Sequence, residues 1–349
     1  MLRIKKNLSN EAARMESWAR WNSIAKPLHS LGLLEDMIVK IAGIHETADV
    51  RIDKRCALVF CADHGVVAEG VSQSGSEVTA LVARSIAEGT ANINLMASCA
   101  NADVYAVDMG MLNPVHGTVD RRIAAGTENM AKRSAMTYEQ ARCALQAGSD
   151  LVGEMKEKGY QIILTGEMGI GNTTASTAMS CALLDFAPEE LTGRGAGLSD
   201  AGLLRKKNAI ERALSVNMPD SNDPVDVLAK VGGLEIAGMA GAFLGGVKHR
   251  VPVVIDGVIS AVAALVAARI CPEAKDFMLP SHMSREPAAL RIMDELNLKP
   301  IIHADMALGE GTGAVALLPL LDMALRVYHG PHTFDDLGMD AYTPQEGTK

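Results

Sequence analysis

The segment IILTGEMGIGNTT, residues 162–174, joins an apolar run to a glycine-rich turn and the start of a helix. The apolar run predicts a buried strand, and Asn172 stands where the N-cap of the following helix is expected. Backbone N–H groups at a helix N-terminus bind anions, so this turn is a candidate anion site; the alternative is a tight packing turn without a ligand. It is not a Walker loop, because no Lys-Ser/Thr pair follows its last glycine, and its glycine spacing differs from that of a dinucleotide fingerprint.

Apolar runs of the same kind recur on both sides of this segment, each separated from the next by enough residues for a helix. This alternation is typical of βαβ units and predicts an α/β fold with a mostly parallel, Rossmann-like sheet of about six strands flanked by helices. Helical spacing of apolar residues predicts helices over 78–97, 138–158 and 173–184. The expected strands are 57–60, 104–107, 161–165, 251–255, 277–279 and 300–303.

Nearly every expected strand runs into a glycine-containing turn or a polar pair with an acid or a histidine. In open α/β sheets, ligands bind outside the carboxyl ends of the strands, so these turns should face one crevice. Each Asp-Gly or Glu-Gly pair, taken singly, is also ordinary turn chemistry. Six at the same end of the sheet favour a site. They are Asp63-His64-Gly65, Asp108-Met109-Gly110, 166–169, Asp256-Gly257, Ser281-His282 and 309–311.

Two further glycine-rich segments carry charged residues. TGRGAGL at 192–198 is followed by Arg205-Lys206-Lys207, and these cations either neutralise phosphate or form only a solvated helix face. LGEGTGA at 308–314 places Glu310 between glycines, which allow a substrate to approach the backbone closely. Two carboxylates near one pocket, Glu167 and Glu310, would raise each other's pKa, which suits one of them to act as a general base near neutral pH. A lone GEGTG is also compatible with a simple turn.

The composition excludes several classes of protein. The formal net charge of −9 is spread along 349 residues without a basic run, so nucleic acid is not an expected partner. Proline, glycine and polar residues interrupt the longest apolar stretch, 251–270, which therefore predicts a strand and a helix and no membrane span. Six isolated cysteines, and basic first residues without a following apolar run, favour a cytoplasmic protein. No metal is expected, because no ligand spacing accompanies His64 or His282.

The two ends of the chain differ from its middle. They are amphipathic and helical in pattern and lack strand signals. We therefore expect residues 1–55 and 315–349 to form a small helical subdomain beside a large α/β catalytic domain at 56–314. The polar last residues, from 332 onward, are expected to be loosely held.

Taken together, the motifs resemble the nicotinate mononucleotide:5,6-dimethylbenzimidazole phosphoribosyltransferase family, which prepares the lower ligand of cobamides (the vitamin B12 group). The resemblance extends from Trp21 to about Val327, and as an ordered set the motifs are highly specific. They are CADHGV (61–66), VYAVDMG (104–110), GEMGIGNTT (166–174), TGRGAGL (192–198), KVGGLEIAGMAGAFLG (230–245), VIDG (254–257), PSH (280–282) and LGEGTGA (308–314).

The resemblance implies a reaction and a set of residue roles. Phosphoribose would pass from nicotinate mononucleotide to an aromatic base, with inversion at the anomeric carbon and without a metal or redox cofactor. Glu310 matches the family's catalytic base, and Glu167 matches a second acid near the ribose and the acceptor. The residues that match the family's site for the phosphate and ribose are Gly169, Gly171, Asn172, Thr173, Gly195 and Lys206.

The acceptor pocket departs from the family pattern. In many relatives a glutamine follows the Val-Thr-Ala of this pocket, whereas here Leu81 and Val82 follow it, and a common proline is replaced by Gly75. A less polar pocket is therefore expected, with Ser74 and Ser76 as hydrogen-bond partners. The acceptor-binding candidates are Ser74, Leu81, Val82, Met168 and Leu308.

Three alternatives remain open from the sequence. Relatives that attach phenol or p-cresol through oxygen, as a pair of unlike subunits, would suit an apolar pocket. An inactive structural partner subunit is disfavoured by the presence of both Glu167 and Glu310. An oxidoreductase using a nicotinamide cofactor would need GxGxxG after the first strand, where ADHG (62–65) stands. The expected assembly is a homodimer, or a heterodimer with a paralogous chain.

Overall fold

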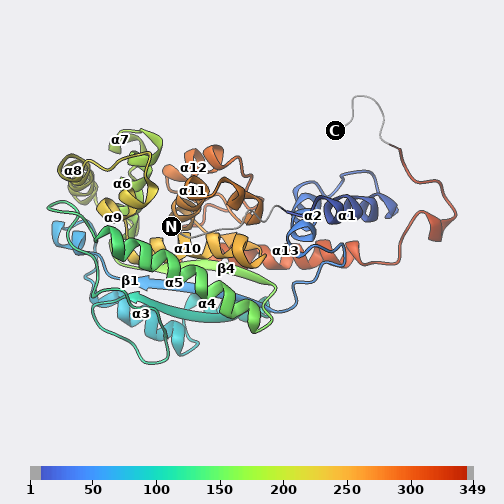
Figure 1. The fold of residues 1–349 in the computed structure, drawn as a ribbon, viewed down its shortest axis with the longest axis horizontal. Helices are drawn as coiled ribbons and strands as arrows, with labels where there is room; N and C mark the ends of the chain where they lie inside the picture. The colour runs from blue at the N-terminus through green and yellow to red at the C-terminus, as the bar shows by residue number, and fades with distance from the viewer. Residues whose placement is uncertain (1–8, 344–349) are drawn as a thin grey trace.

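The computed structural model describes residues 9–343 and contains a six-stranded, entirely parallel sheet with the strand order β3-β2-β1-β4-β5-β6 (Figure 1). The predicted fold class, a parallel α/β sheet flanked by helices, is confirmed. The strands are β1 Arg55–Ala62, β2 Asp103–Gly110, β3 Val119–Asp120, β4 Ile162–Met168, β5 Val253–Ile255 and β6 Met278–Pro280.

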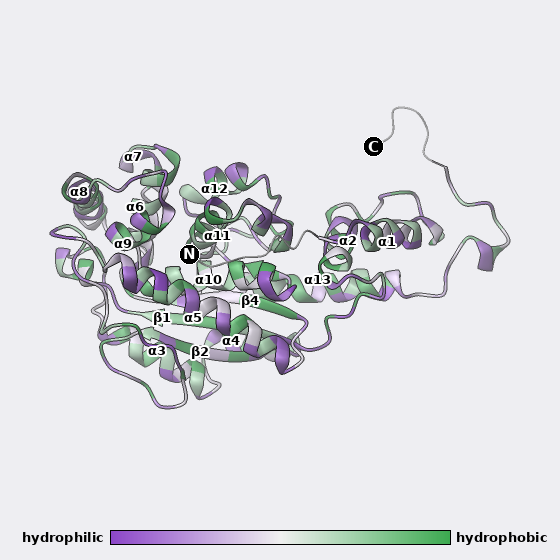
Figure 2. Cartoon of the chain, viewed as in Figure 1, coloured by the Kyte–Doolittle hydropathy of each residue, from purple (hydrophilic) through white to green (hydrophobic). Residues whose placement is uncertain are grey.

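The central strand β1 is buried along its whole length and shows why the apolar runs form a sheet. Leu58 and Phe60 belong to the core on one face, whereas Ala57 and Val59 belong to the core on the other. Parallel strands covered on both faces are expected to be continuously apolar. Figure 2 shows hydrophobic residues along the central strands and on helix faces next to the sheet.

Helices cover both faces of the sheet. Helices α5, α6, α10 and α11 contribute to the core on one face, and α3, α4 and α13 contribute to the other. The helices are α1 Glu11–Ser23, α2 Leu33–His45, α3 Glu77–Ala87, α4 Asn92–Cys99, α5 Tyr138–Glu157, α6 Asn172–Leu184, α7 Pro188–Leu191, α8 Asp200–Asn217, α9 Pro224–Val231, α10 Leu234–His249, α11 Val258–Ile270, α12 Ala288–Leu296 and α13 Thr312–Tyr328, with short 3₁₀ helices η1 Gly65–Glu69, η2 Pro272–Phe277 and η3 Asp335–Leu337. Among residues 9–343, none of these helices has both the length and the apolar character needed to cross a bilayer.

Three expectations about individual elements were wrong. Residues 300–303 form no strand; only Ile302 makes a bridge, to His282. The two-residue strand β3 was missed because so short and partly exposed a segment has no apolar pattern. The helix expected over 78–97 is two helices, α3 and α4, because the chain turns at Gly89, where φ is +80°.

The N-terminal helices α1 and α2 lie beside α13 and the segment directly after it (Figure 1). The Arg20 guanidinium of α1 donates hydrogen bonds to the carbonyls of Tyr328 and Gly330, and Ile24 pairs with Thr333. Helix α13 also packs on β4. The expected boundary at residue 315 falls inside this helix, which is continuous from Thr312 to Tyr328. The division into a catalytic domain and a terminal subdomain stays a prediction, and its outermost parts, residues 1–8 and 344–349, lie outside the described residues.

Candidate active site

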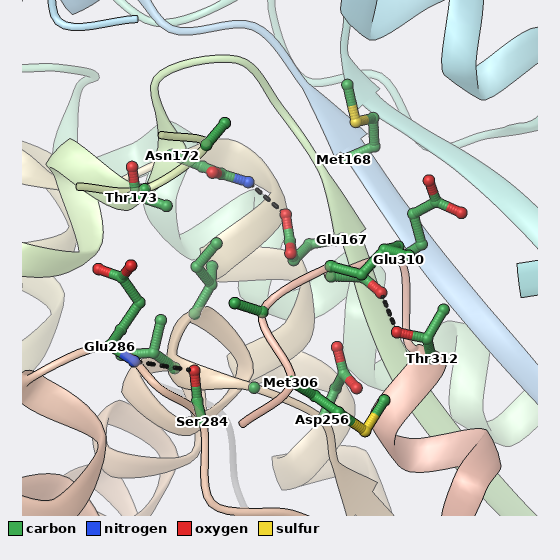
Figure 3. Close-up of a pocket in the computed structure, with 18 of the residues that line it drawn as sticks. Glu167, Met168, Asn172, Thr173, Asp256, Ser284, Glu286, Met306, Glu310 and Thr312 are labelled. Carbon is green, nitrogen blue, oxygen red and sulfur yellow. Dashed lines mark hydrogen bonds between the residues drawn. The ribbon is translucent and has the colours of Figure 1, made fainter. Parts of the chain in front are cut away.

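A cavity of about 270 Å³ opens at the carboxyl ends of β4, β5 and β6 (Figure 3). It lies where ligands bind in open parallel sheets. The turn after β4, the start of α11, the segment after β6 and the loop before α13 supply its walls. The lining residues are Val82, Glu167, Met168, Gly169, Ile170, Asn172, Thr173, Gly195, Ala196, Asp256, Gly257, Val258, Ile259, His282, Ser284, Glu286, Met306, Ala307, Leu308, Gly309, Glu310 and Thr312.

Glu167, near the end of β4, is a buried carboxyl held by the helix that follows. The Asn172 side-chain amide donates a hydrogen bond to it, so Asn172 is not the N-cap that was expected. Gly171 takes that position with a left-handed φ of +98°. Burial raises the pKa of Glu167 well above its ordinary value, and the negative charges of Asp256 and Glu235 add to this effect. A raised pKa favours the protonated form of this carboxyl, which can donate a hydrogen bond to a ligand.

Glu310 occupies a backbone conformation that residues other than glycine rarely adopt. Its φ is +62°, and the flanking Gly309 and Gly311 also have positive φ. The turn lies directly against β4, since a Cβ on Gly166 would overlap the Glu310 carbonyl group. The Glu310 carboxyl accepts a hydrogen bond from the Ile93 N–H at 3.2 Å, and in Figure 3 it points away from the Glu167 carboxyl. Backbone strain of this kind is often found at functional sites.

Asp256, directly after β5, connects the sheet to the loop that carries Glu310. Its carboxyl accepts hydrogen bonds from the Ala314 N–H at 2.9 Å and the Gly311 N–H at 3.2 Å, at the start of α13. Burial raises the pKa of Asp256 to about 7, against the opposing effect of these backbone N–H groups. The sequence indicated Asp256 only as part of a turn, and its contacts with α13 follow from the tertiary structure.

Thr173 and Gly195, with Lys206 behind them, form one corner of the cavity, which we call the anion corner. The Lys206 ammonium is fully buried and donates to the Thr173 hydroxyl at 2.9 Å and to the Gly193 carbonyl at 3.2 Å. Burial lowers the pKa of Lys206 to about 8, partly opposed by the charge of Glu286. Lys206 does not itself line the cavity and lies behind Thr173. The N-terminus of α6 adds backbone N–H groups to this corner, an arrangement that suits phosphate.

Several residues expected in the site lie elsewhere. Leu81 is 53% exposed and Ser74 lies outside the cavity lining, as Leu81 does. Gly171 lies beneath the turn, against His64 and Val67. The apolar side of the cavity is formed by Val82, Met168, Leu308 and Met306.

The prediction that all six turns face one crevice was wrong for the turns after β1 and β2. The His64 ring is buried in a contact of 2.7 Å with Glu235, and Asp63 accepts a hydrogen bond from the Leu112 N–H. Asp108 accepts one from the Met111 N–H. These polar groups are engaged in contacts with other protein groups and do not line the cavity.

The segment after β6 supplies residues that the sequence motifs did not indicate. Ser284 and Glu286 line the cavity, and His282 packs against the first turn of α13, where a Cβ on Gly313 would overlap its ring. Burial lowers the pKa of His282. The signal that could have found Ser284 and Glu286 is their place directly after a strand that ends at the same edge as β4 and β5. Within residues 9–343, no three His, Cys, Asp or Glu side chains gather in a way that could hold a metal ion.

A parallel α/β sheet with an anion corner and carboxyl groups in one cavity is a site for a phosphorylated small molecule, and comparison with known proteins gives its class. The family profile described as Phosphoribosyltransferase matches residues 7–339, so the chain belongs to this phosphoribosyltransferase family. The predicted resemblance is confirmed.

Individual relatives are similar over almost their entire length. The protein named nicotinate-nucleotide–dimethylbenzimidazole phosphoribosyltransferase in Acetivibrio thermocellus is 45% identical over 93% of this chain and 93% of its own. The protein of the same name in Ruminiclostridium cellulolyticum is 41% identical over 94% of each chain. The crystal structure of CobT from Thermus thermophilus superposes with a TM-score of 0.88, at 37% identity, over 95% of this chain and 100% of that chain.

Proposed function

We propose that the protein transfers phosphoribose from nicotinate mononucleotide to 5,6-dimethylbenzimidazole, a reaction in the assembly of the cobamide nucleotide loop. The observation that carries the proposal is that one cavity joins the anion corner to the Glu167 and Glu310 loops and an apolar wall. These parts suit, in order, a phosphate, the reacting sugar carbon and a flat aromatic acceptor. The names of the relatives support the same donor and acceptor.

The chemistry is a single displacement at the anomeric carbon. The acceptor nitrogen forms a bond to C1 of the ribose while the bond from C1 to the nicotinate ring nitrogen breaks, and the electron pair of that bond leaves with nicotinate. The departing ring is a pyridinium before and a neutral pyridine after the step, so it needs no proton. Attack from the opposite face gives the α-riboside phosphate. The acceptor must lose its N–H proton, and we assign its capture to Glu310.

Positioning contributes more to the rate than proton transfer does. Holding two reactants in a reactive geometry lowers the activation barrier by about 7–11 kcal/mol in favourable cases. One well-placed general base raises the rate by about 10²–10⁴-fold. The Asp256 carboxyl accepts hydrogen bonds from the N–H groups of Gly311 and Ala314, and these bonds keep the Glu310 loop in place. The Glu167 carboxyl, held by Asn172, is the second acid near the ribose.

The direct test is to incubate the purified protein with nicotinate mononucleotide and dimethylbenzimidazole. We expect nicotinate and the α-riboside phosphate in equal amounts, identified by chromatography and mass spectrometry. Parallel incubations contain phenol or p-cresol. The absence of product with every acceptor would refute the proposed activity, and product with the phenols alone would replace benzimidazole by phenol as the acceptor. Leu81, one of the two apolar residues that favoured phenol in the sequence, lies outside the cavity and so does not support that acceptor.

The Glu310→Gln variant tests the assignment of the base. Glutamine keeps the size of the side chain but is not basic, so kcat should fall by about 10²–10⁴-fold with little change in the KM for mononucleotide. Steady-state kinetics with the parent protein as the control measures both constants. Near-normal kcat in this variant would remove Glu310 from the role of base.

The exposed apolar side chains and the free cysteines bear on the assembly and the location of the protein. Exposed apolar side chains such as Leu81, Leu95 and Leu112 favour burial against a second copy, so we propose a homodimer, with a paralogous chain as the alternative partner. All six cysteines are free, in keeping with a cytoplasmic location. Light scattering at micromolar concentration should give twice the chain mass of 36.9 kDa, and a monomeric mass would contradict the proposal.

A further inference from the structure

Glu286 brings an uncompensated carboxyl group to the cavity. It lies between β6 and α12 and lines the cavity wall. Within residues 9–343, its carboxylate makes no hydrogen bond and no ion pair at contact distance. In Figure 3 the carboxylate points toward Thr173, in the anion corner. A carboxylate in this position is available to a ligand.

The local backbone holds Glu286 in this orientation. The carboxylate packs against Gly193, where a Cβ would overlap its Oε2 atom, and Pro287 touches the same glycine. The Ser284 hydroxyl accepts a hydrogen bond from the Glu286 N–H at 3.4 Å. Glu286 is also close enough to Lys206 for its charge to oppose the effect of burial on the lysine pKa. The carboxylate is therefore a built part of the corner.

The hydrogen-bonding chemistry identifies which part of a phosphoribosyl donor Glu286 can contact. An ionised carboxylate only accepts hydrogen bonds. The donor's phosphate offers acceptors, and so does its nicotinate carboxylate. The ribose hydroxyls at C2 and C3 are its hydrogen-bond donors. With the phosphate at Thr173 and Gly195, the ribose is the next group along the cavity, within reach of Glu286 at the edge of the same corner.

We infer that Glu286 accepts a hydrogen bond from at least one of the C2 and C3 hydroxyls of the donor and selects ribose over deoxyribose. The inference rests on the proposed function, because it takes the ligand to be a phosphoribosyl compound. A site built to bind a hydroxyl rejects the analogue that lacks it, since the polar group that faces the missing hydroxyl then loses its partner when the ligand covers it. Glu286 is thus a specificity-determining residue and takes no part in proton transfer.

The binding test uses ribose 5-phosphate and its 2-deoxy and 3-deoxy analogues, titrated into the full-length protein in a calorimeter. We expect the parent protein to bind ribose 5-phosphate at least tenfold more tightly than one of the two analogues. Glu286→Ala should bind all three sugars with similar affinity, and Glu286→Gln should retain part of the preference, because its amide oxygen still accepts a hydrogen bond. The matched control is Glu295→Gln, which makes the same change on the surface of α12, where Glu295 pairs with Arg269.

Two results would overturn the inference. One is an Ala variant that keeps the parent's preference for ribose. The other is an Ala variant that binds all three sugars more tightly than the parent does, because the carboxylate would then be occupying the place of the phosphate. Unchanged melting temperatures of the variants establish that they are folded.

A kinetic measurement separates this inference from the proposed function. With nicotinate mononucleotide and its 2′-deoxy and 3′-deoxy analogues as donors, Glu286→Ala should lose the parent's discrimination in kcat/KM. If the parent gives no product with the ordinary donor, the proposed function fails. The calorimetric comparison still reports whether Glu286 recognises the sugar hydroxyls.

Discussion

Adjacent residues of α3 have different surroundings, although both were expected at the acceptor wall. Val82 lines the cavity, whereas Leu81 is 53% exposed. On a helix, neighbouring residues point about 100° apart, so only one of the two can face a given wall. The local sequence does not indicate which one.

This difference predicts the effects of a matched pair of variants. Val82→Gln should shift the acceptor preference from phenol toward dimethylbenzimidazole by on the order of tenfold, or about 1.4 kcal/mol, because glutamine adds a hydrogen-bond partner for the ring nitrogen. Leu81→Gln is the control and should leave the ratio unchanged. Competition between the two acceptors, with both products quantified, measures the ratio. An equal shift in both variants would contradict the placement of the wall.

Lys206 predicts a pH dependence of donor binding. Its pKa is lowered to about 8 by burial, so the free enzyme loses this positive charge as the pH rises through about 8. The kcat/KM for mononucleotide should therefore fall above pH 8 in the parent protein. Lys206→Ala should show a higher KM and a flat profile in the same range. A parent profile that is flat from about pH 7 to 9 would show that the lysine charge does not assist binding.

At the scale of elements, the site depends on where helices begin. Helix α6 begins after the turn that follows Glu167 and the end of β4, and α13 begins at the turn that carries Glu310. Asp256 bonds to the first N–H groups of α13, which lack partners within the helix. One carboxyl at the end of β5 thus sets the position of the Glu310 loop relative to the sheet.

Asp256 also predicts how stability changes with pH. The pKa of Asp256 in the folded protein is about 7, above the ordinary 3.8. Between these two pH values the folded protein binds one proton at Asp256 that the unfolded chain does not bind. The contribution of Asp256 to the unfolding free energy therefore falls as the pH rises through this range. Asp256→Asn removes this titration. The unfolding free energy of the parent minus that of the variant, measured with urea, should be higher at about pH 5 than at about pH 7 by about 2 kcal/mol.

The control for this measurement is Asp294→Asn, on the exposed side of α12. In this variant the unfolding free energy should change between these two pH values by the same amount as in the parent protein. If the stability difference for Asp256→Asn were the same at both pH values, Asp256 would not hold the extra proton in this range.

At the scale of the whole molecule, the core depends on close packing of α5 against α10. A Cβ on Gly148 would overlap the carbonyl oxygen of Gly238, and one on Gly241 would overlap that of Leu145. These glycines let the two helix backbones approach each other beneath the sheet. The motif at 230–245, rich in glycine and alanine, therefore has a structural explanation in this pair of helices.

Gly148→Ala should destabilise the fold. The added methyl group must displace a backbone rather than a flexible side chain, and overpacking of this kind costs about 1–3 kcal/mol. Urea unfolding measures the loss, with Cys143→Ala on the exposed face of the same helix as the control, for which little change is expected. A stable Gly148→Ala protein would indicate looser packing of the two helices.

The sequence alone determined the parallel sheet, the glycine-rich turn between β4 and α6, and the presence of Glu167 and Glu310 in one crevice. These features depend on local patterns and on the rule that parallel strands end at one edge of the sheet. Only the tertiary structure decided that Lys206 lies behind Thr173, that Asp256 holds α13, and that Glu286 faces the cavity while Leu81 and the His64–Glu235 pair do not line it. The physical reason is that a pattern specifies which residues are in a turn. The direction of each side chain is set by contacts between segments far apart in the chain.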